Sequence, residues 1–207
     1  MNTKFLTTAA VLAFSLSTGA QASLVARGGG MVYDDVNNIT WAADANLAQT
    51  SGYDADGKMT WTEAVAWADQ LTLGGFTNWS LPTTVPAVAG TEQKGSQMGD
   101  LFYNQLGGVA GTDIATTHNA NYDLFKNVKN SVYLSSSEYA PNPNNYSWTF
   151  YTENGNQYGN YKGNEFYAWA VRSGDVSVAA VPVPGAFWLF GSAMVGLMGL
   201  KRRKNIG

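Results

Sequence analysis

The chain has 207 residues, and its composition already excludes several kinds of site. It has no cysteine and one histidine, so disulfides, zinc–thiolate sites, thiol nucleophiles and sites that need two imidazoles are excluded. Residues 23–180 contain all 15 acidic residues but only 7 of the 12 basic ones, a net charge of −8. Because so acidic a surface repels the phosphate backbone, we expect no nucleic-acid partner.

The first 22 residues have the parts of a secretory signal peptide. Lys4 gives the basic start, residues 5–16 form an apolar stretch interrupted only by small hydroxyl residues, and Ala20-Gln21-Ala22 is a cleavage site with small residues at Ala20 and Ala22. The sequence therefore predicts export by the Sec machinery and cleavage by signal peptidase. The mature domain is expected to span residues 23–180.

Two helices are predicted in the first half of this domain. Thr60-Trp61-Thr62-Glu63 is a capping box, and apolar residues then recur at helical spacing until Gly74-Gly75, which we expect to end the helix. A second, shorter helix is predicted from Ser96 to Gly107-Gly108. Its expected buried residues are Met98, Leu101, Phe102 and Leu106.

From Ser131 onward the apolar period changes to two, which predicts strands. Tyr146, Trp148 and Phe150 fall on one face, which we expect to be core, and Asn154-Gly155 favours a type I′ hairpin. A further turn at 162–164 leads into 166–172, completing a three-stranded antiparallel meander. Two helices followed by a curled antiparallel sheet indicate an α+β fold in a single domain.

Residues 52–63 have part of the ligand pattern of a calcium-binding EF-hand loop. Asp54, Asp56 and Glu63 occupy ligand positions, but Gly52 stands where the first carboxylate is expected. The alternative is that Asp54 and Asp56 stabilise a turn and that Glu63 belongs to the capping box. Calcium at Asp54, Asp56 and Glu63 is therefore one of two hypotheses for this loop.

Aromatic and amide side chains alternate between Tyr139 and Tyr167. Aromatic rings present flat apolar faces and amides offer paired donors and acceptors, a combination that suits carbohydrate. The alternative is that the inward-facing rings are core and that the amides are turn residues. Tyr151, Tyr158 and Tyr161 are the candidates for an exposed carbohydrate-binding face.

No catalytic residue stands out. His118 lies in a polar Thr/Asn stretch typical of a solvated loop, and the sequence singles out no pair of carboxylates for glycoside cleavage. A polysaccharide-processing enzyme and a structural matrix protein without a ligand remain the alternatives to a binding module.

Residues 181–207 combine an apolar run with a basic end. Val181–Leu200 is uncharged and would span about 30 Å as a helix, the thickness of a bilayer core. Lys201-Arg202-Arg203-Lys204 follows at once, so we expect one membrane span with the acidic domain outside the cytoplasm.

This segment resembles the VPxPGA-type PEP-CTERM sorting signal. It begins with Val-Pro-Val-Pro-Gly-Ala, which contains Pro182, Pro184 and Gly185, and the basic residues Lys201, Arg202 and Arg203 follow its apolar run, as in that signal. The resemblance implies an exported protein of a Gram-negative bacterium. It also implies transient anchoring in the inner membrane, processing by an exosortase, and a final place at the cell surface or in the extracellular matrix.

Eight short motifs between residues 31 and 176 resemble the Lcl C-terminal domain-like family of bacterial surface proteins. They are 31–35, 39–41, 52–57, 60–64, 74–82, 100–107, 135–141 and 168–172. The resemblance implies a C-type-lectin-like fold and a role in adhesion or polysaccharide binding. The sequence departs from the family pattern at Ser80, where an arginine is usual, and at Leu134, where a tryptophan is usual.

Overall fold

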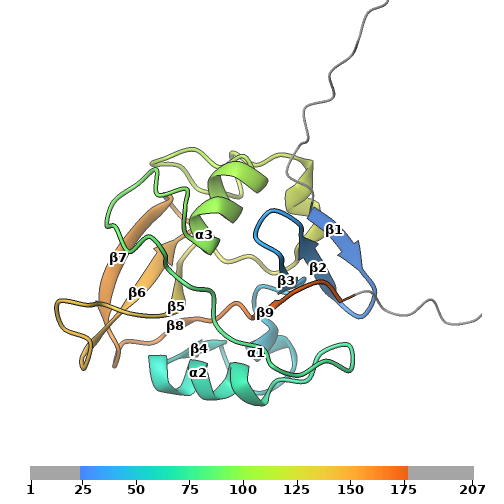
Figure 1. Cartoon of the computed structure of the whole chain (residues 1–207), viewed down its shortest axis with the longest axis horizontal. Helices are drawn as coiled ribbons and strands as arrows, with labels where there is room; N and C mark the ends of the chain where they lie inside the picture. Colours follow the sequence, from blue (N-terminus) through green and yellow to red (C-terminus); the bar gives the residue numbers. More distant parts are fainter. Residues whose placement is uncertain (1–23, 177–207) are drawn as a thin grey trace, which may run out of the picture.

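Two sheets and a few short helices make up residues 24–176, the part of the chain that the computed structural model describes (Figure 1). The α+β prediction is confirmed, but the expectation of a single curled sheet is wrong. The predicted signal peptide and the predicted sorting segment, including the residues singled out in both, lie outside the described residues. Within 24–176, no helix is long and apolar enough to cross a membrane.

The first sheet joins the two ends of the described chain. Its strand order is β1 (Leu24–Arg27), β2 (Met31–Asp34), β3 (Ile39–Ala42) and β9 (Val171–Ser173), and all neighbours are antiparallel. The guanidinium of Arg27 donates two hydrogen bonds to the Asp175 carboxylate, at 2.8 and 2.7 Å. This ion pair and the pairing of β3 with β9 hold the ends together.

The second sheet has the order β4 (Lys58–Met59), β8 (Phe166–Tyr167), β5 (Val132–Glu138), β6 (Tyr146–Tyr151) and β7 (Asn156–Tyr161). Strands β5, β6 and β7 form an antiparallel meander, while β8 runs parallel to β5. The predicted third meander strand, 166–172, is wrong. That segment divides between the two sheets because its middle part, Ala168-Trp169-Ala170, is buried in the core.

The β6–β7 turn also differs from the prediction. Tyr151 pairs with Asn156, so the loop has four residues, and of Asn154 and Gly155 only Gly155 has a positive φ, +73°. A two-residue type I′ turn is therefore excluded. The Tyr103 hydroxyl donates to the carbonyl of Gly155 at 2.7 Å and ties this turn to the helical layer.

The capping box at Thr60 is confirmed as the start of α2 (Trp61–Gln70). The Glu63 carboxylate accepts from the backbone N–H and the hydroxyl of Thr60 at 2.9 and 2.7 Å. The helix ends before Gly74-Gly75, contrary to expectation. These glycines instead make a tight turn with φ of +61° and +84°, and the flanking Leu73 and Phe76 exchange two backbone hydrogen bonds of 3.0 Å.

The second predicted helix also begins as expected. The Ser96 hydroxyl accepts from the backbone N–H of Gly99 at the start of α3 (Gln97–Asp100), which continues as a π-helical turn, Leu101–Gln105. The four predicted core residues of this segment are buried. Two further short helices complete the fold: α1 (Leu47–Thr50) and the 3₁₀ helix Ala120–Leu124.

Trp169 lies at the centre of the core, between the sheets. Its ring contacts those of Trp41, Phe125 and Tyr133, with centroid distances of 5.4, 5.1 and 5.5 Å, and its indole N–H donates to the carbonyl of Ala42 at 2.8 Å. One side chain therefore connects β3, β5 and the segment that precedes β9.

We expect Trp169→Ala to lower the free energy of unfolding by about 3–5 kcal/mol, because it opens a large cavity and leaves a buried carbonyl without its donor. Trp169→Phe keeps most of the ring contacts and should cost less. Denaturant unfolding with fluorescence and circular dichroism measures both. Val36→Ala, at an exposed position, is the control, with an expected change within about 0.5 kcal/mol. Equal losses for Ala and Phe would contradict the packing role of the ring.

A second prediction concerns acid sensitivity. The hydroxyl and the backbone N–H of Thr60 hold the pKa of Glu63 below its ordinary value. This stabilising contribution is present above the unfolded-state pKa of ~4.3 and is lost as the pH falls through the lower folded-state pKa. Glu63→Gln still accepts from Thr60 but does not titrate, so its melting temperature should fall less steeply with acidification. Thr60→Ser should keep the wild-type profile, and parallel profiles for wild type and Glu63→Gln would refute this assignment.

Candidate functional site

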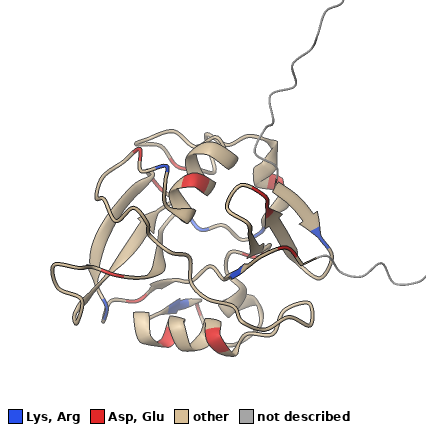
Figure 2. Ribbon diagram, viewed as in Figure 1, with Lys and Arg blue, Asp and Glu red and all other residues tan. Residues whose placement is uncertain are grey.

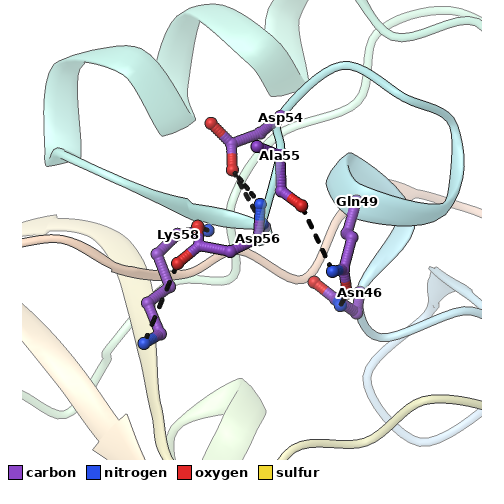
Figure 3. A network of polar contacts seen from close by, with 7 residues as sticks. Asn46, Gln49, Asp54, Ala55, Asp56 and Lys58 are labelled. Atoms are coloured by element: carbon purple, nitrogen blue, oxygen red, sulfur yellow. Dashed lines mark hydrogen bonds and ion pairs between the residues drawn. The ribbon is translucent and has the colours of Figure 1, made fainter.

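The loop 52–58, which holds two of the predicted calcium ligands, is a network of turns (Figure 3). Asp54 accepts the backbone N–H groups of Asp56 and Gly57 at 3.0 and 2.7 Å, and Asp56 accepts that of Lys58 at 3.0 Å. Gln49 of α1 donates to the carbonyl of Ala55 and so joins the loop to the first helix.

The structure therefore gives each predicted calcium ligand a local role. Asp54 and Asp56 stabilise turns, and Glu63 caps α2. Within residues 24–176, no three acidic, histidine or cysteine side chains are placed together as a metal centre. Calcium at Asp54, Asp56 and Glu63 stays a hypothesis. The contacts that these carboxylates make are the ones expected if Asp54 and Asp56 stabilise turns and Glu63 caps the helix.

A shallow groove of about 350 Å³ lies beside α2. Its floor is mostly apolar, and three hydroxyls and one carboxylate are among its lining groups. The lining residues are Thr62, Val65, Ala66, Asp69, Trp79, Ser80, Leu81 and Ser136. The small side chain of Ser80 forms part of this wall.

The β6–β7 hairpin carries the aromatic residues that the sequence singled out, and its register sorts them onto two faces. Tyr146 lies opposite Tyr161, and Trp148 lies opposite Gly159. The Tyr139 ring lies close over Gly159 and meets the Trp148 ring edge-on at 5.1 Å. We call Tyr139, Tyr146, Trp148 and Tyr161 the aromatic patch.

The aromatic patch has exposed rings at its outer end and a buried ring beneath them. Tyr146 and Tyr161 are 37% and 50% exposed, and their ring centroids are 6.0 Å apart. Trp148 is buried, and its indole N–H has no hydrogen-bond partner. At the border, the ammonium of Lys162 lies 3.8 Å from the centroid of Trp61 and 2.6 Å from the Glu138 carboxylate.

Tyr151 and Tyr158 lie on the opposite face, so the three predicted carbohydrate-binding tyrosines do not form one surface. Tyr158 is exposed, whereas Tyr151 is half-buried and its hydroxyl accepts from the Asn160 amide at 2.8 Å. Tyr161 belongs to the aromatic patch. Tyr146 was expected in the core, but it lies near the strand end, where the covering layer stops. The period-two pattern predicts on which face of a strand a side chain lies, but it does not predict how far the neighbouring layer covers that face.

His118 is exposed in its loop and stacks on the ring of Tyr122, with centroids 4.2 Å apart. Its Nδ1 lies 3.1 Å from the carbonyl oxygen of Asn119. These contacts fit the interpretation of His118 as a solvated loop residue.

Comparison with known proteins identifies one relationship. The family model described as the Lcl C-terminal domain matches residues 30–172, nearly all of the described fold and more than half of the chain. No curated protein and no solved structure gave a significant match. The chain belongs to the Lcl C-terminal domain family.

Proposed function

We propose that this protein is an exported surface or matrix protein whose domain binds polysaccharide without catalysis, and that the aromatic patch is its binding face. The observation that carries the proposal is the pair of exposed rings, Tyr146 and Tyr161, beside each other on one face of the hairpin. The planes of the two rings stand at 70° to each other, so each ring offers its own apolar surface to the C–H faces of a sugar chain, and the phenol hydroxyls suit the polar edges.

The neighbouring polar groups support a sugar ligand. The loop between β5 and β6 brings the exposed amides of Asn142 and Asn145 to the same end of the hairpin, linked by a 3.1 Å hydrogen bond. Aromatic faces with amide donors and acceptors at their rim are chemically complementary to a neutral glycan.

Charge favours a neutral rather than an anionic polysaccharide. Residues 23–180 carry a net charge of −8, and Figure 2 shows the basic residues scattered along the ribbon. Lys162, the cation at the border of the patch, is already paired with Glu138. An anionic chain would meet repulsion without a compensating basic cluster at the patch.

Export, sorting and fold ancestry are further parts of the proposal. The signal-peptide pattern and the PEP-CTERM-like segment support delivery across the inner membrane and removal of the tag by an exosortase. A C-type-lectin-like ancestry is supported by family membership and by the pairing of the first and last parts of the described chain in one sheet.

We expect the double variant Tyr146→Ala/Tyr161→Ala to bind neutral polysaccharide at least tenfold more weakly, a loss of about 1.4 kcal/mol, because the stacking surface is removed. Tyr158→Ala is the matched control, since it removes an exposed tyrosine from the opposite face. A glycan array followed by calorimetry measures both, and melting curves verify the fold. Weakening by Tyr158→Ala alone would move the site to the other face.

The non-catalytic part of the proposal has its own test. Incubation of the purified protein with the polysaccharides that it binds should release no reducing sugar. Release above that of a heat-inactivated sample would instead identify a glycoside-cleaving enzyme.

For sorting, we expect replacement of both Pro182 and Pro184 by alanine to leave unprocessed protein in the inner membrane, because the apolar run and the basic end remain. Intact-mass measurement of membrane and surface fractions tests this. A wild-type protein that still carries residues 181–207 at its final location would defeat the sorting claim.

A further inference from the structure

The aromatic patch and the groove beside α2 are neighbours, and two separate connections join them. Ser136 of β5 lines the groove, and Tyr139 of the patch follows three residues later, a reach of at most about 11 Å. The second connection is at the start of α2. The backbone N–H of Trp61 donates to the carbonyl of Lys162 at 3.0 Å, and Lys162 directly follows Tyr161 of the patch.

An ion pair lies between the patch and the groove. The ammonium of Lys162 lies 2.6 Å from the carboxylate of Glu138, and Glu138 itself lies between Ser136 and Tyr139 on the chain. The side chain of Glu138 is 50% exposed. A carboxylate has about four acceptor positions, so Glu138 can accept from a sugar hydroxyl while it keeps its contact with Lys162.

The groove has the chemistry of a sugar subsite and polar groups that are still free to bind. Val65, Trp79 and Leu81 supply apolar surface for the C–H face of a sugar ring. Within residues 24–176, neither the hydroxyl of Thr62 nor the carboxylate of Asp69 has a hydrogen-bond or ion-pair partner. The volume of about 350 Å³ falls in the range of small-ligand sites, roughly 300–1,000 Å³.

We propose that the aromatic patch, Glu138 and the groove form one continuous track for a long neutral polysaccharide chain. This inference rests on the proposed function, to which it adds the groove as a second subsite. The groove is shallow and the patch lies on the surface, so neither encloses a chain end, and the track suits the interior of a polymer. Glu138 and Asp69 place carboxylates along it, which disfavours an anionic chain.

The track predicts that affinity depends on chain length. A short oligosaccharide fills the patch alone, whereas a longer chain also reaches the groove, and that second contact is intramolecular. Calorimetry on the purified full-length protein compares disaccharides and hexasaccharides of neutral glucans, mannans, xylans and N-acetylhexosamine polymers. In the series that binds, we expect the hexasaccharide to bind roughly a hundredfold more tightly. Equal affinities for the two lengths would overturn the track.

Ala66→Arg tests the groove itself. Ala66 is an exposed groove residue of α2, so a long side chain there fills the groove without entering the core, and it can pair with Asp69 one turn away. We expect this variant to lose the gain of the hexasaccharide and to keep the disaccharide affinity. Gln70→Arg is the matched control, because it makes the same charge change at an exposed position of α2 outside the groove and should keep the gain.

The patch variant Tyr146→Ala/Tyr161→Ala separates failure of the track from failure of the proposed function. It should weaken both lengths, and melting curves verify the fold of every variant. If it does so while Ala66→Arg binds the hexasaccharide like wild type, the track is refuted and the patch remains the binding face. If only Ala66→Arg weakens binding, the groove alone is the site and both proposals fail. Absence of binding by every oligosaccharide and by its parent polymer would overturn both as well.

Discussion

The fold depends on the burial of one short segment, Ala168-Trp169-Ala170, between the two sheets. On one side of it, β8 pairs with β4 and β5, and on the other, β9 pairs with β3. The indole of Trp169 fills the space between them and satisfies its N–H on β3. Because this segment belongs to neither ladder, the chain passes from one sheet to the other through the buried core.

This arrangement decides which part of the β6–β7 hairpin faces the core. Phe150 packs on Phe102 with centroids 5.5 Å apart, and the hydroxyl of Tyr103 holds the turn at Gly155. The bridge between Gln157 and Gly90 covers part of the outer edge of β7. The opposite end of the hairpin extends past these supports, so Tyr146 and Tyr161 remain on the surface. A rigid strand pair then holds the patch rings in place, and little ordering is needed on binding.

Contacts between residues close together in the chain could be predicted from the sequence, whereas contacts between distant residues could not. Thr60 with Glu63, and Ser96 with Gly99, are contacts within one helical turn, so local patterns predict both helix starts. The division of 166–172 depends on partners more than a hundred residues away in β3, which no local period encodes. The exposure of Tyr146 cannot be predicted from the local sequence either, because it depends on where the layer that covers its face of β6 ends. The Asn37 amide donates to both Asp34 and Asp100, which belong to two separate elements, so no local motif predicts this contact.

Loop 52–58 and the start of α2 show what occupies the carboxylates of a familiar ligand pattern. Backbone N–H groups fix Asp54 and Asp56 in the turn, so a metal would have to displace the bonds that shape it. Glu63 is held in the same way by the hydroxyl and the backbone N–H of Thr60. The same three carboxylates thus satisfy local backbone groups first, which is why the pattern alone does not distinguish a metal loop from a turn followed by a helix cap.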